Sequence, residues 1–477
     1  MLRFAARCGL ALAAAALAAC SDRPLVTGPS PSSAAVWLTT PDQSRLLAPQ
    51  PGIAFGDDQH GAAAYTLDVD DETRFQEIAG FGAAVTGSAA HLMHSLKAEE
   101  RTGLMRSLFD GEAGIGLSFV RVPMGASDFS LRSYTYSDLP AGERDPGLLG
   151  FSIDPDRTEI LPVLRLARAM NPALRVMASP WTAPAWMKTG GKLEGGSLRP
   201  DAFGVYAQYF RRFVQAYEAE GVPIYAVTVQ NEPRHEAAYP SMRMEPGEQV
   251  SFVRDHLGPA FAAHGIGARI LAWDHNWDDA EYALEVLADA GASRYIAGTA
   301  FHCYAGDVAA QSRVHQAFSS KEIFFTECSG GNWSPDFRTN LVWNLKHLVI
   351  GATRNWSRSV LLWNLALDPA GGPVNGGCAD CRGVVTVDPA TGRVQRNVEY
   401  YVLGHASKFV QPGAVRVASS DVDQAGVDNV AFLNPDGSRV LIALNSTGGP
   451  RSFRVRWRER SFVYELPGAS AATFVWS

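Results

Sequence analysis

Two glutamates in this sequence stand where short apolar segments end, and their surroundings suit acid–base chemistry. Glu232 follows the apolar run 224–230, and Glu327 closes the run 322–327. Cleavage of a glycosidic bond requires one carboxyl group that protonates the leaving oxygen and a second that attacks the anomeric carbon or activates water. We interpret Glu232 as the proton donor and Glu327 as the nucleophile, with a solvated loop position as the alternative for either. A retaining pair would have its carboxyl groups ~5 to 5.5 Å apart.

Further polar and aromatic residues follow the other apolar segments. A cleft lined with carboxylates and aromatic rings suits a sugar, because the C–H faces of the sugar stack on the rings while its hydroxyls bond to charged and amide groups. Such a cleft suits a phosphate poorly. The candidate residues are Asp128, Trp181, Asn231, Asp274, His302, Tyr304, Trp363 and Asp368.

These residues come together only if the segments that carry them form a closed sheet. Eight short apolar segments alternate with longer helical patterns, such as 157–170 and 201–220. This alternation predicts an α/β fold, a (β/α)8 TIM barrel, whose strand ends converge on one mouth. A doubly wound open sheet is the rival, but no glycine-rich nucleotide loop follows the first strand. The predicted strands are 76–85, 117–124, 175–181, 224–230, 269–274, 296–304, 322–327 and 359–365.

The C-terminal part of the chain has a different pattern. From Val415 onward, short alternating runs are separated by turn signals such as Asn-Pro-Asp-Gly at 434–437, which is typical of antiparallel hairpins. These runs predict a side antiparallel β-sandwich, to which 35–38 and 64–69 could add strands. The predicted segments are 1–19 (signal peptide), 20–35 (lipidated cysteine and flexible tether), 36–75 (N-terminal strands of the sandwich), 76–408 (catalytic barrel) and 409–477 (C-terminal sandwich).

The N-terminus is typical of a targeting segment. Arg3 and Arg7 precede the apolar run 9–19, which is too short to span a bilayer as a stable anchor. The run ends in Leu-Ala-Ala-Cys, which resembles a bacterial lipobox with Cys20 as the lipidated residue; an ordinary signal peptide is the alternative. We expect an exported bacterial lipoprotein, periplasmic or at the cell surface, that contacts a membrane through its lipid anchor only. The formal charge of −7 argues against nucleic acid as a partner.

One set of motifs runs from about residue 36 to the end of the chain. It comprises QEIAGFG at 76–82, VRVPM at 120–124 with DFS at 128–130, ASPWTAP at 178–184, QNEP at 230–233 and WNLALD at 363–368. In this order the motifs resemble glycoside hydrolase family 30, in particular its glucosylceramidase-like and β-1,6-glucanase-like branch. The resemblance implies a barrel with a side sandwich built from both chain ends, retention of configuration, no metal and no cofactor.

The same resemblance implies roles for individual residues. Glu232 would be the acid/base and Glu327 the nucleophile of a retaining β-glycoside hydrolase. Arg121 would lie beneath the nucleophile and keep it ionised, and Tyr239 would form a hydrogen bond near the pair. Sugar binding is implied for Asp128, Trp181, Asn231, His302, Tyr304 and Trp363.

The substrate is expected to be a β-linked glucoside, glucan or glycolipid. We expect glucosylceramidase-like action on glucosylceramide or β-glucosides, with an endo-β-1,6-glucanase as the alternative within the family. A non-catalytic carbohydrate-binding surface lipoprotein is the alternative from another class. The chain departs from the pattern of lysosomal glucosylceramidase at Cys303, where that pattern has a tryptophan, and again at 377–381.

Four cysteines remain after the N-terminal segment. Cys378 and Cys381 are predicted to form a local disulfide in an exported protein, and zinc is disfavoured because only one Cys-x-x-Cys pair exists without a companion His spacing. By strand alternation, Cys303 and Cys328 should face away from the barrel mouth as buried free thiols, with a second bridge as the alternative.

Three further polar residues are candidates for the site. His302 is predicted to be a hydrogen-bonding pocket residue rather than a metal ligand, because no second His lies at ligand spacing. Asp274 and Asp278 are predicted to line outer subsites, with helix N-capping by Asp278 as the alternative.

Overall fold

The computed structural model of this protein describes residues 33–57, 63, 65–421 and 426–477. The predicted signal peptide, Cys20 and the tether up to residue 32 lie outside these ranges. Within the described ranges, no helix is both long enough and apolar enough to cross a membrane.

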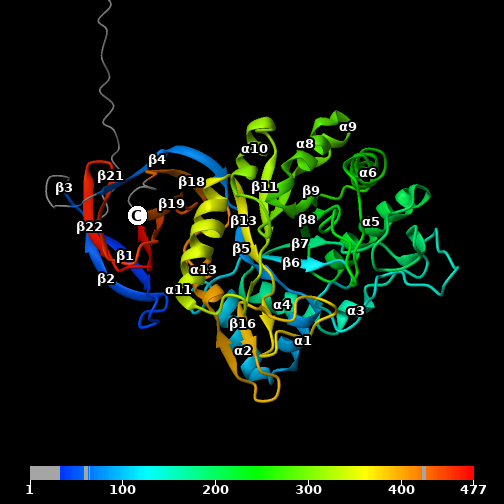
Figure 1. Cartoon of the computed structure of the whole chain (residues 1–477), viewed down its shortest axis with the longest axis horizontal. Coiled ribbons are helices and arrows are strands. Elements are labelled where there is room, and N and C mark those ends of the chain that lie inside the picture. The colour runs from blue at the N-terminus through cyan, green and yellow to red at the C-terminus, as the bar shows by residue number, and fades with distance from the viewer. Residues whose placement is uncertain (1–32, 58–62, 64, 422–425) are drawn as a thin grey trace, which may run out of the picture.

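Eight parallel strands form a closed barrel, which confirms the predicted fold (Figure 1). The strands follow one another around the barrel, and the last pairs with the first. Successive side chains point to opposite faces: Leu271 and Phe324 fill the interior, whereas their neighbours Ile270 and Phe325 pack against the helices. The strands are β5 (Gly80–Ala84), β6 (Phe119–Pro123), β7 (Arg175–Ser179), β8 (Ile224–Thr228), β9 (Arg269–Asn276), β10 (Ile296–His302), β11 (Glu322–Glu327) and β13 (Ser357–Leu362).

Helices surround this barrel and cover its outer apolar face (Figure 1). Two stretches within the helical layer are π-helical, η3 (Val253–Leu257) and η5 (Asn344–Gly351). Three short 3-10 helices, η1 (Ala185–Met187), η2 (Pro200–Ala202) and η4 (Trp277–Asp279), lie in the loops. The α-helices are α1 (Gly87–Ser95), α2 (Ala98–Phe109), α3 (Asp154–Arg157), α4 (Ile160–Met170), α5 (Phe203–Ala219), α6 (Pro246–Phe252), α7 (Gly258–Ala263), α8 (Ala280–Ala288), α9 (Ala290–Ser293), α10 (Ala309–Ala317), α11 (Phe337–Trp343), α12 (Ala352–Arg354) and α13 (Val398–Ser407).

The predicted side sandwich is also present, and both ends of the chain build it (Figure 1). Its strands hydrogen-bond in one continuous order and enclose a separate apolar core that includes Leu67, Phe453 and Phe474. The strands are β1 (Ser33–Thr39), β2 (Ala48–Ala54), β3 (Gly56–Asp57), β4 (Tyr65–Glu77), β18 (Val415–Ser419), β19 (Val427–Leu433), β20 (Arg439–Asn445), β21 (Arg451–Trp457), β22 (Arg460–Leu466) and β23 (Ala471–Trp476).

Two predicted boundaries shift in the structure. The tether was expected to reach residue 35, but β1 begins at Ser33, because Ala34 and Val36 are buried in the sandwich core. The first barrel strand was expected from residue 76, but the long strand β4 continues to Glu77 and pairs with β18 of the sandwich. Barrel strand β5 therefore begins only at Gly80.

Helix α13 joins the barrel to the sandwich. Its buried His405 bonds through Nδ1 to Thr473 and through Nε2 to Thr39, both at 2.8 Å. Burial lowers the pKa of His405 to about 3, so the imidazole is neutral and bridges two sandwich strands. The sandwich therefore braces the back of the barrel through a specific polar contact as well as through apolar packing.

The four cysteines form two disulfides. Cys378 is bonded to Cys381, the pairing predicted for this loop. Cys303 is bonded to Cys328, so the expectation of two free thiols is wrong. Strand alternation misled that expectation because both residues lie just past the ends of β10 and β11, where their Cα atoms are 5.4 Å apart.

Short strands beyond the barrel ends shape the loops over the mouth. Gly330–Gly331 (β12) pairs with Cys381–Arg382 (β15), which ties the loop after β11 to the loop of the Cys378–Cys381 disulfide. A second small sheet comprises β14 (Ala366–Leu367), β16 (Val385–Val387) and β17 (Val394–Arg396).

Candidate active site

A pocket of about 530 Å³ lies at the carboxyl ends of the barrel strands. This size is typical of small-molecule sites, and this end of a TIM barrel carries the catalytic groups in characterised enzymes. The lining residues are Asp128, Phe129, Glu232, His235, Tyr239, His275, Asn276, Tyr304, Glu327, Ser329, Trp333, Trp363, Gly376, Gly377, Cys378 and Cys381.

Glu232 and Glu327 face each other across this pocket. A carboxylate oxygen of each lies within 4.8 Å of the other, close to the spacing of a retaining pair and far below that of an inverting pair. Their side chains are 14% and 7% exposed. Glu232 has a positive φ of 44°, and its backbone N–H donates to the carbonyl of Asp274 at 3.0 Å. A residue held in this unfavourable region is characteristic of a functional site.

Arg121 lies beneath the nucleophile candidate and is fully buried. One guanidinium nitrogen donates to Glu327, and another donates to Asn231 Oδ1 at 2.7 Å and to Asp274 Oδ2 at 2.8 Å. The guanidinium carbon lies 4.8 Å from the ring centroid of Trp181. Arg121 therefore neutralises two buried carboxylates and orients the amide next to Glu232.

Asp274 is the acceptor around which this network is built. Its carboxylate also accepts hydrogen bonds from the hydroxyls of Thr228, Ser179 and Thr326 at 2.6, 3.0 and 2.8 Å. Burial would raise the pKa of Asp274, but the charge of Arg121 and the bonds to this carboxylate outweigh it and hold the pKa far below its usual range. Asp274 therefore remains an anion.

The expectation that Asp274 lines an outer subsite is wrong, because its side chain is completely buried. Its neighbours Trp273 and His275 pair with consecutive residues of β10, so Asp274 is an extra residue with a φ of 69°. This bulge turns the carboxylate toward the barrel axis. Asp278 does not cap the next helix either, since Asp279 accepts the capping hydrogen bond of α8.

His302 connects Asp274 to the acid/base candidate. Its Nε2 lies 3.1 Å from Asp274 Oδ1, and its Nδ1 lies 3.1 Å from Glu232 Oε1. Burial lowers the pKa of His302, but the charge of Glu327 and the bonds to Asp274 and Glu232 more than offset it, and the pKa rises to about 9. At neutral pH a proton is therefore held in the hydrogen bond between His302 and Glu232.

The pKa values of both glutamates depend on burial and on the neighbouring His302. Burial raises the pKa of Glu327, while the cations of His302 and Arg121 act against this rise. Burial acts to raise the pKa of Glu232, but the hydrogen bond and the charge of His302 outweigh it and hold this pKa below its usual value. In the resting site the shared proton therefore lies on the His302 side of the hydrogen bond, and it must pass through Glu232 to reach a leaving group.

The other predicted sugar-binding residues gather around this pair. Tyr304 donates to Glu327 Oε1 at 3.0 Å, and Tyr239 bonds His235 at 3.1 Å. The rings of Trp181 and Trp363 stack at 5.0 Å. Both rings are buried, but only Trp363 lines the pocket, whereas Trp181 does not reach it.

Asp128 presents an acceptor that the described residues leave unused. Its Oδ1 is buried and has no hydrogen-bond partner among the residues described. Burial, followed by the charges of Glu327 and Glu232, raises the pKa of Asp128 well above its usual value. A hydroxyl group in the pocket would satisfy this atom.

Sequence reasoning missed several residues of the pocket. Most of them lie in or shortly after the end of a barrel strand, which is the one signal that could have identified them, whereas Gly376 and Gly377 lie in the long loop after β13. The missed residues are Phe129, His235, His275, Asn276, Ser329, Trp333, Gly376 and Gly377.

One cluster in this pocket has the composition of a metal site. Ligand atoms of Glu232, His302 and Glu327 lie within 4.8 Å of one another. A cation there would compete with the guanidinium of Arg121 on Glu327 and with the proton between His302 and Glu232. The donor set is therefore already satisfied by charges suited to proton transfer and nucleophilic attack.

Substitution of Arg121 by methionine is expected to lower the free energy of unfolding by about 3 to 5 kcal/mol, because Glu327 and Asp274 would keep buried charges without a partner. Chemical denaturation measures this loss. Arg313→Met, which removes an exposed partner of Glu281, should cost less than about 1 kcal/mol. If the free energy of unfolding falls equally little in both variants, the charge network does not stabilise this site. Arg121→Lys, which keeps the positive charge, serves as the comparison.

A (β/α)8 barrel that presents two opposed carboxylic acids at its mouth has the architecture of a glycoside hydrolase. The TIM-barrel domain of glycosyl hydrolase family 30 matches residues 78–410, and the β-sandwich domain of that family matches residues 413–474. The chain belongs to glycosyl hydrolase family 30.

Individual relatives differ in substrate. Endo-1,6-β-D-glucanase neg1 of Aspergillus fumigatus is 34% identical over 442 residues, which cover 87% of this chain and 88% of that protein. Lysosomal acid glucosylceramidase of Mus musculus is 32% identical over 440 residues, which cover 86% of this chain and 81% of that protein. The structure of the endo-β1,6-glucanase BT3312 superposes with a TM-score of 0.88 at 34% identity and covers 93% of this chain and 99% of that chain.

Proposed function

We propose that this enzyme is a retaining endo-β-1,6-glucanase. The chemistry rests on one observation, the close opposition of Glu232 and Glu327 with Arg121 on the latter and His302 on the former. The linkage rests on the likeness to proteins named as endo-1,6-β-glucanases, in sequence and in structure. This support favours the expected alternative over glucosylceramidase-like action.

In the first step, a carboxylate oxygen of Glu327 forms a bond to the anomeric carbon as the glycosidic C–O bond breaks. The departing oxygen takes the proton held between Glu232 and His302, delivered through Glu232. Formation of the ester removes the negative charge of Glu327, which contributes most to the raised pKa of His302. The proton affinity of His302 and Glu232 therefore falls at the moment when the leaving group takes up the proton.

In the second step, the same pair takes a proton from water, and the resulting hydroxide oxygen bonds to the anomeric carbon. The ester bond to Glu327 breaks, its electrons return to the carboxylate, and Arg121 again neutralises the charge. Two inversions at one carbon leave the product with the β configuration of the substrate.

A second candidate is glucosylceramide hydrolysis. It is favoured by the 32% identity to mouse lysosomal acid glucosylceramidase over most of both chains. The same two carboxyl groups would perform the chemistry, so only the groups that bind beyond the cleaved bond would differ.

Product analysis on a linear β-1,6-glucan, glucosylceramide in micelles and an aryl β-glucoside separates these functions. We expect a ladder of oligosaccharides to form early from the glucan, with β-anomers as the first products by NMR. Release of glucose from glucosylceramide alone would support the second candidate. Absence of turnover on all three substrates would favour the non-catalytic binding protein.

The predicted lipid anchor at Cys20 stays a prediction, because residues 1–32 lie outside the described residues. A periplasmic or surface location would suit an enzyme that acts on an extracellular glucan.

A further inference from the structure

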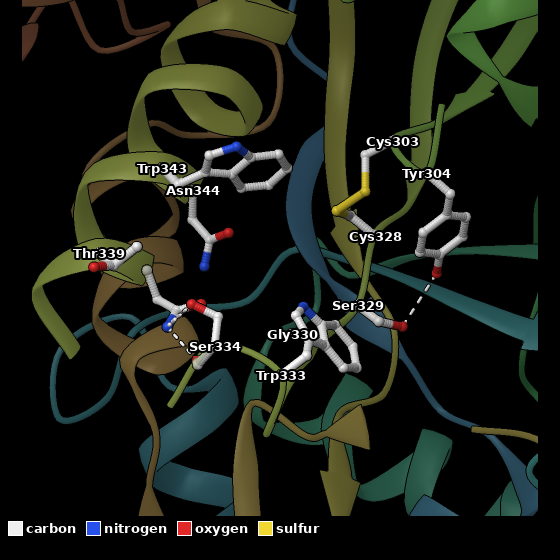
Figure 2. A pocket seen from close by; sticks show the side chains of 11 residues that line it. Cys303, Tyr304, Cys328, Ser329, Gly330, Trp333, Ser334, Thr339, Trp343 and Asn344 are labelled. Atoms are coloured by element: carbon white, nitrogen blue, oxygen red, sulfur yellow. Dashed lines mark hydrogen bonds between the residues drawn. A yellow bond between two sulfur atoms is a disulfide. The ribbon is translucent and has the colours of Figure 1, made fainter. Parts of the chain in front are cut away.

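A second cavity of about 360 Å³ adjoins the active-site pocket (Figure 2). The two cavities share Tyr304, Ser329 and Trp333. The hydroxyl of Tyr304 bonds both to Glu327 at 3.0 Å and to Ser329 at 3.1 Å, so one side chain separates the nucleophile from the second cavity. The lining residues are Cys303, Tyr304, Cys328, Ser329, Gly330, Trp333, Ser334, Thr339, Asn340, Trp343 and Asn344.

Two exposed indole rings form the walls of this cavity. Trp333 is 56% exposed and Trp343 is 40% exposed, which is unusual for such large apolar side chains. A Cβ atom at Gly331 would meet the ring of Trp333 at 1.9 Å, so only a glycine at this position allows the ring to approach the backbone so closely. The Cys303–Cys328 disulfide lines the cavity between Tyr304 and the helix that carries Trp343 (Figure 2).

Asn344 supplies an unused polar group. Asn344 is 6% exposed as a whole residue, and its side-chain amide forms no hydrogen bond with any group in the described part of the chain. Figure 2 shows this amide directed into the space between Trp343 and Trp333. An amide at the edge of a cavity that has no protein partner can both donate to and accept from a bound hydroxyl. Asn344 also begins the π-helix η5, a rare local structure that often marks functional sites.

The chemistry of the lining identifies the class of ligand. None of the lining residues carries a charge, so the cavity offers no partner to an ionic ligand. The lining has no aliphatic side chain of the kind that packs against an acyl chain, and it combines indole rings with amides and hydroxyls. Indole faces accept the C–H face of a sugar ring, and amides accept and donate hydrogen bonds to its hydroxyls.

We propose that this cavity is an accessory subsite that binds a glucosyl unit of the same β-glucan chain whose cleaved bond lies at Glu327. The proposal rests on the proposed glucanase function and extends it to a longer binding path. Trp343 provides the stacking face and Asn344 provides the hydrogen bonds, while Tyr304 belongs to both sites.

The test compares β-1,6-gluco-oligosaccharides from the disaccharide to the octasaccharide. For the wild type, kcat/KM should rise with chain length until the accessory subsite is filled. In Trp343→Ala and Asn344→Leu, the ratio of kcat/KM for long over short substrates should fall about tenfold, mainly through KM. Trp343→Phe should keep most of the length dependence, and Leu149→Ala, at an exposed loop residue, should keep all of it.

Thermal unfolding separates binding from a structural role. Asn344→Leu removes an amide without a partner, so its Tm without sugar should equal or exceed that of the wild type. Unchanged length dependence in both variants, or a lowered Tm for Asn344→Leu, would overturn the accessory subsite while leaving the glucanase function intact.

If the wild type cleaves no β-1,6-glucan, the proposed function fails and the subsite is judged by binding alone. Calorimetric titration of Glu327→Gln with neutral β-linked glucose oligosaccharides then gives the answer. Binding that is lost in the double variant with Trp343→Ala supports the subsite. Binding that is independent of Trp343, binding only of fatty-acyl ligands, or no binding refutes it.

Discussion

Replacement of Glu327 by glutamine should reduce kcat on aryl β-glucosides and on β-1,6-glucan by at least about 10⁴-fold, because the amide cannot form the glycosyl-enzyme ester. The fold should survive, since the amide occupies the same volume between Arg121 and Tyr304. Glu281→Gln makes the same chemical change on an exposed side chain and should leave kcat within about twofold. Steady-state kinetics on the purified variants measures the effect.

Added azide tests which face of the sugar Glu327 attacks. In Glu327→Ala, azide fits the vacated space and attacks the anomeric carbon of an activated aryl β-glucoside once, so the product should be the α-glucosyl azide. The phenolate leaves with the bond electrons, and one inversion has occurred. A β-glucosyl azide from this variant, or activity of Glu327→Gln close to that of the wild type, would remove Glu327 from the role of nucleophile.

Replacement of Glu232 by alanine should lower kcat/KM on β-1,6-glucan by about 10²- to 10⁴-fold, because the sugar leaving group needs a proton. An aryl β-glucoside with a strongly acidic phenol leaves without that proton, so its first step should be nearly unaffected and the glycosyl-enzyme should accumulate. A burst of phenol followed by slow turnover is therefore expected. Azide should speed the second step and give the β-glucosyl azide, the product of two inversions.

The same variant predicts a change in pH dependence. In the wild type, kcat/KM on the glucan should fall at high pH, because the pair of Glu232 and His302 loses its transferable proton. For the activated aryl glucoside in Glu232→Ala, this alkaline decline should disappear, since no proton is donated. An alkaline decline that persists unchanged in the variant would show that another group titrates there.

The sequence by itself determined the barrel, the sandwich and the two glutamates. These features are local: alternating apolar segments make strands, and Glu232 and Glu327 stand at or just beyond strand ends, which a closed barrel must bring to one mouth. The hairpin signals in the sequence also predicted the side sandwich. The exact first residues of β1 and β5 depended on which apolar residues are buried in the folded chain.

Only the tertiary structure decided which groups set the pKa values of the two glutamates and which cavity lies next to them. The extra residue in β9 turns Asp274 inward. The alternation of apolar and polar residues along a strand does not predict such a bulge. The Cys303–Cys328 bridge and the cavity between Trp333 and Trp343 depend on loops that leave two neighbouring strands and meet a helix from farther along the chain. Contacts of this kind arise from the packing of distant segments, so their geometry becomes visible only after the barrel has closed.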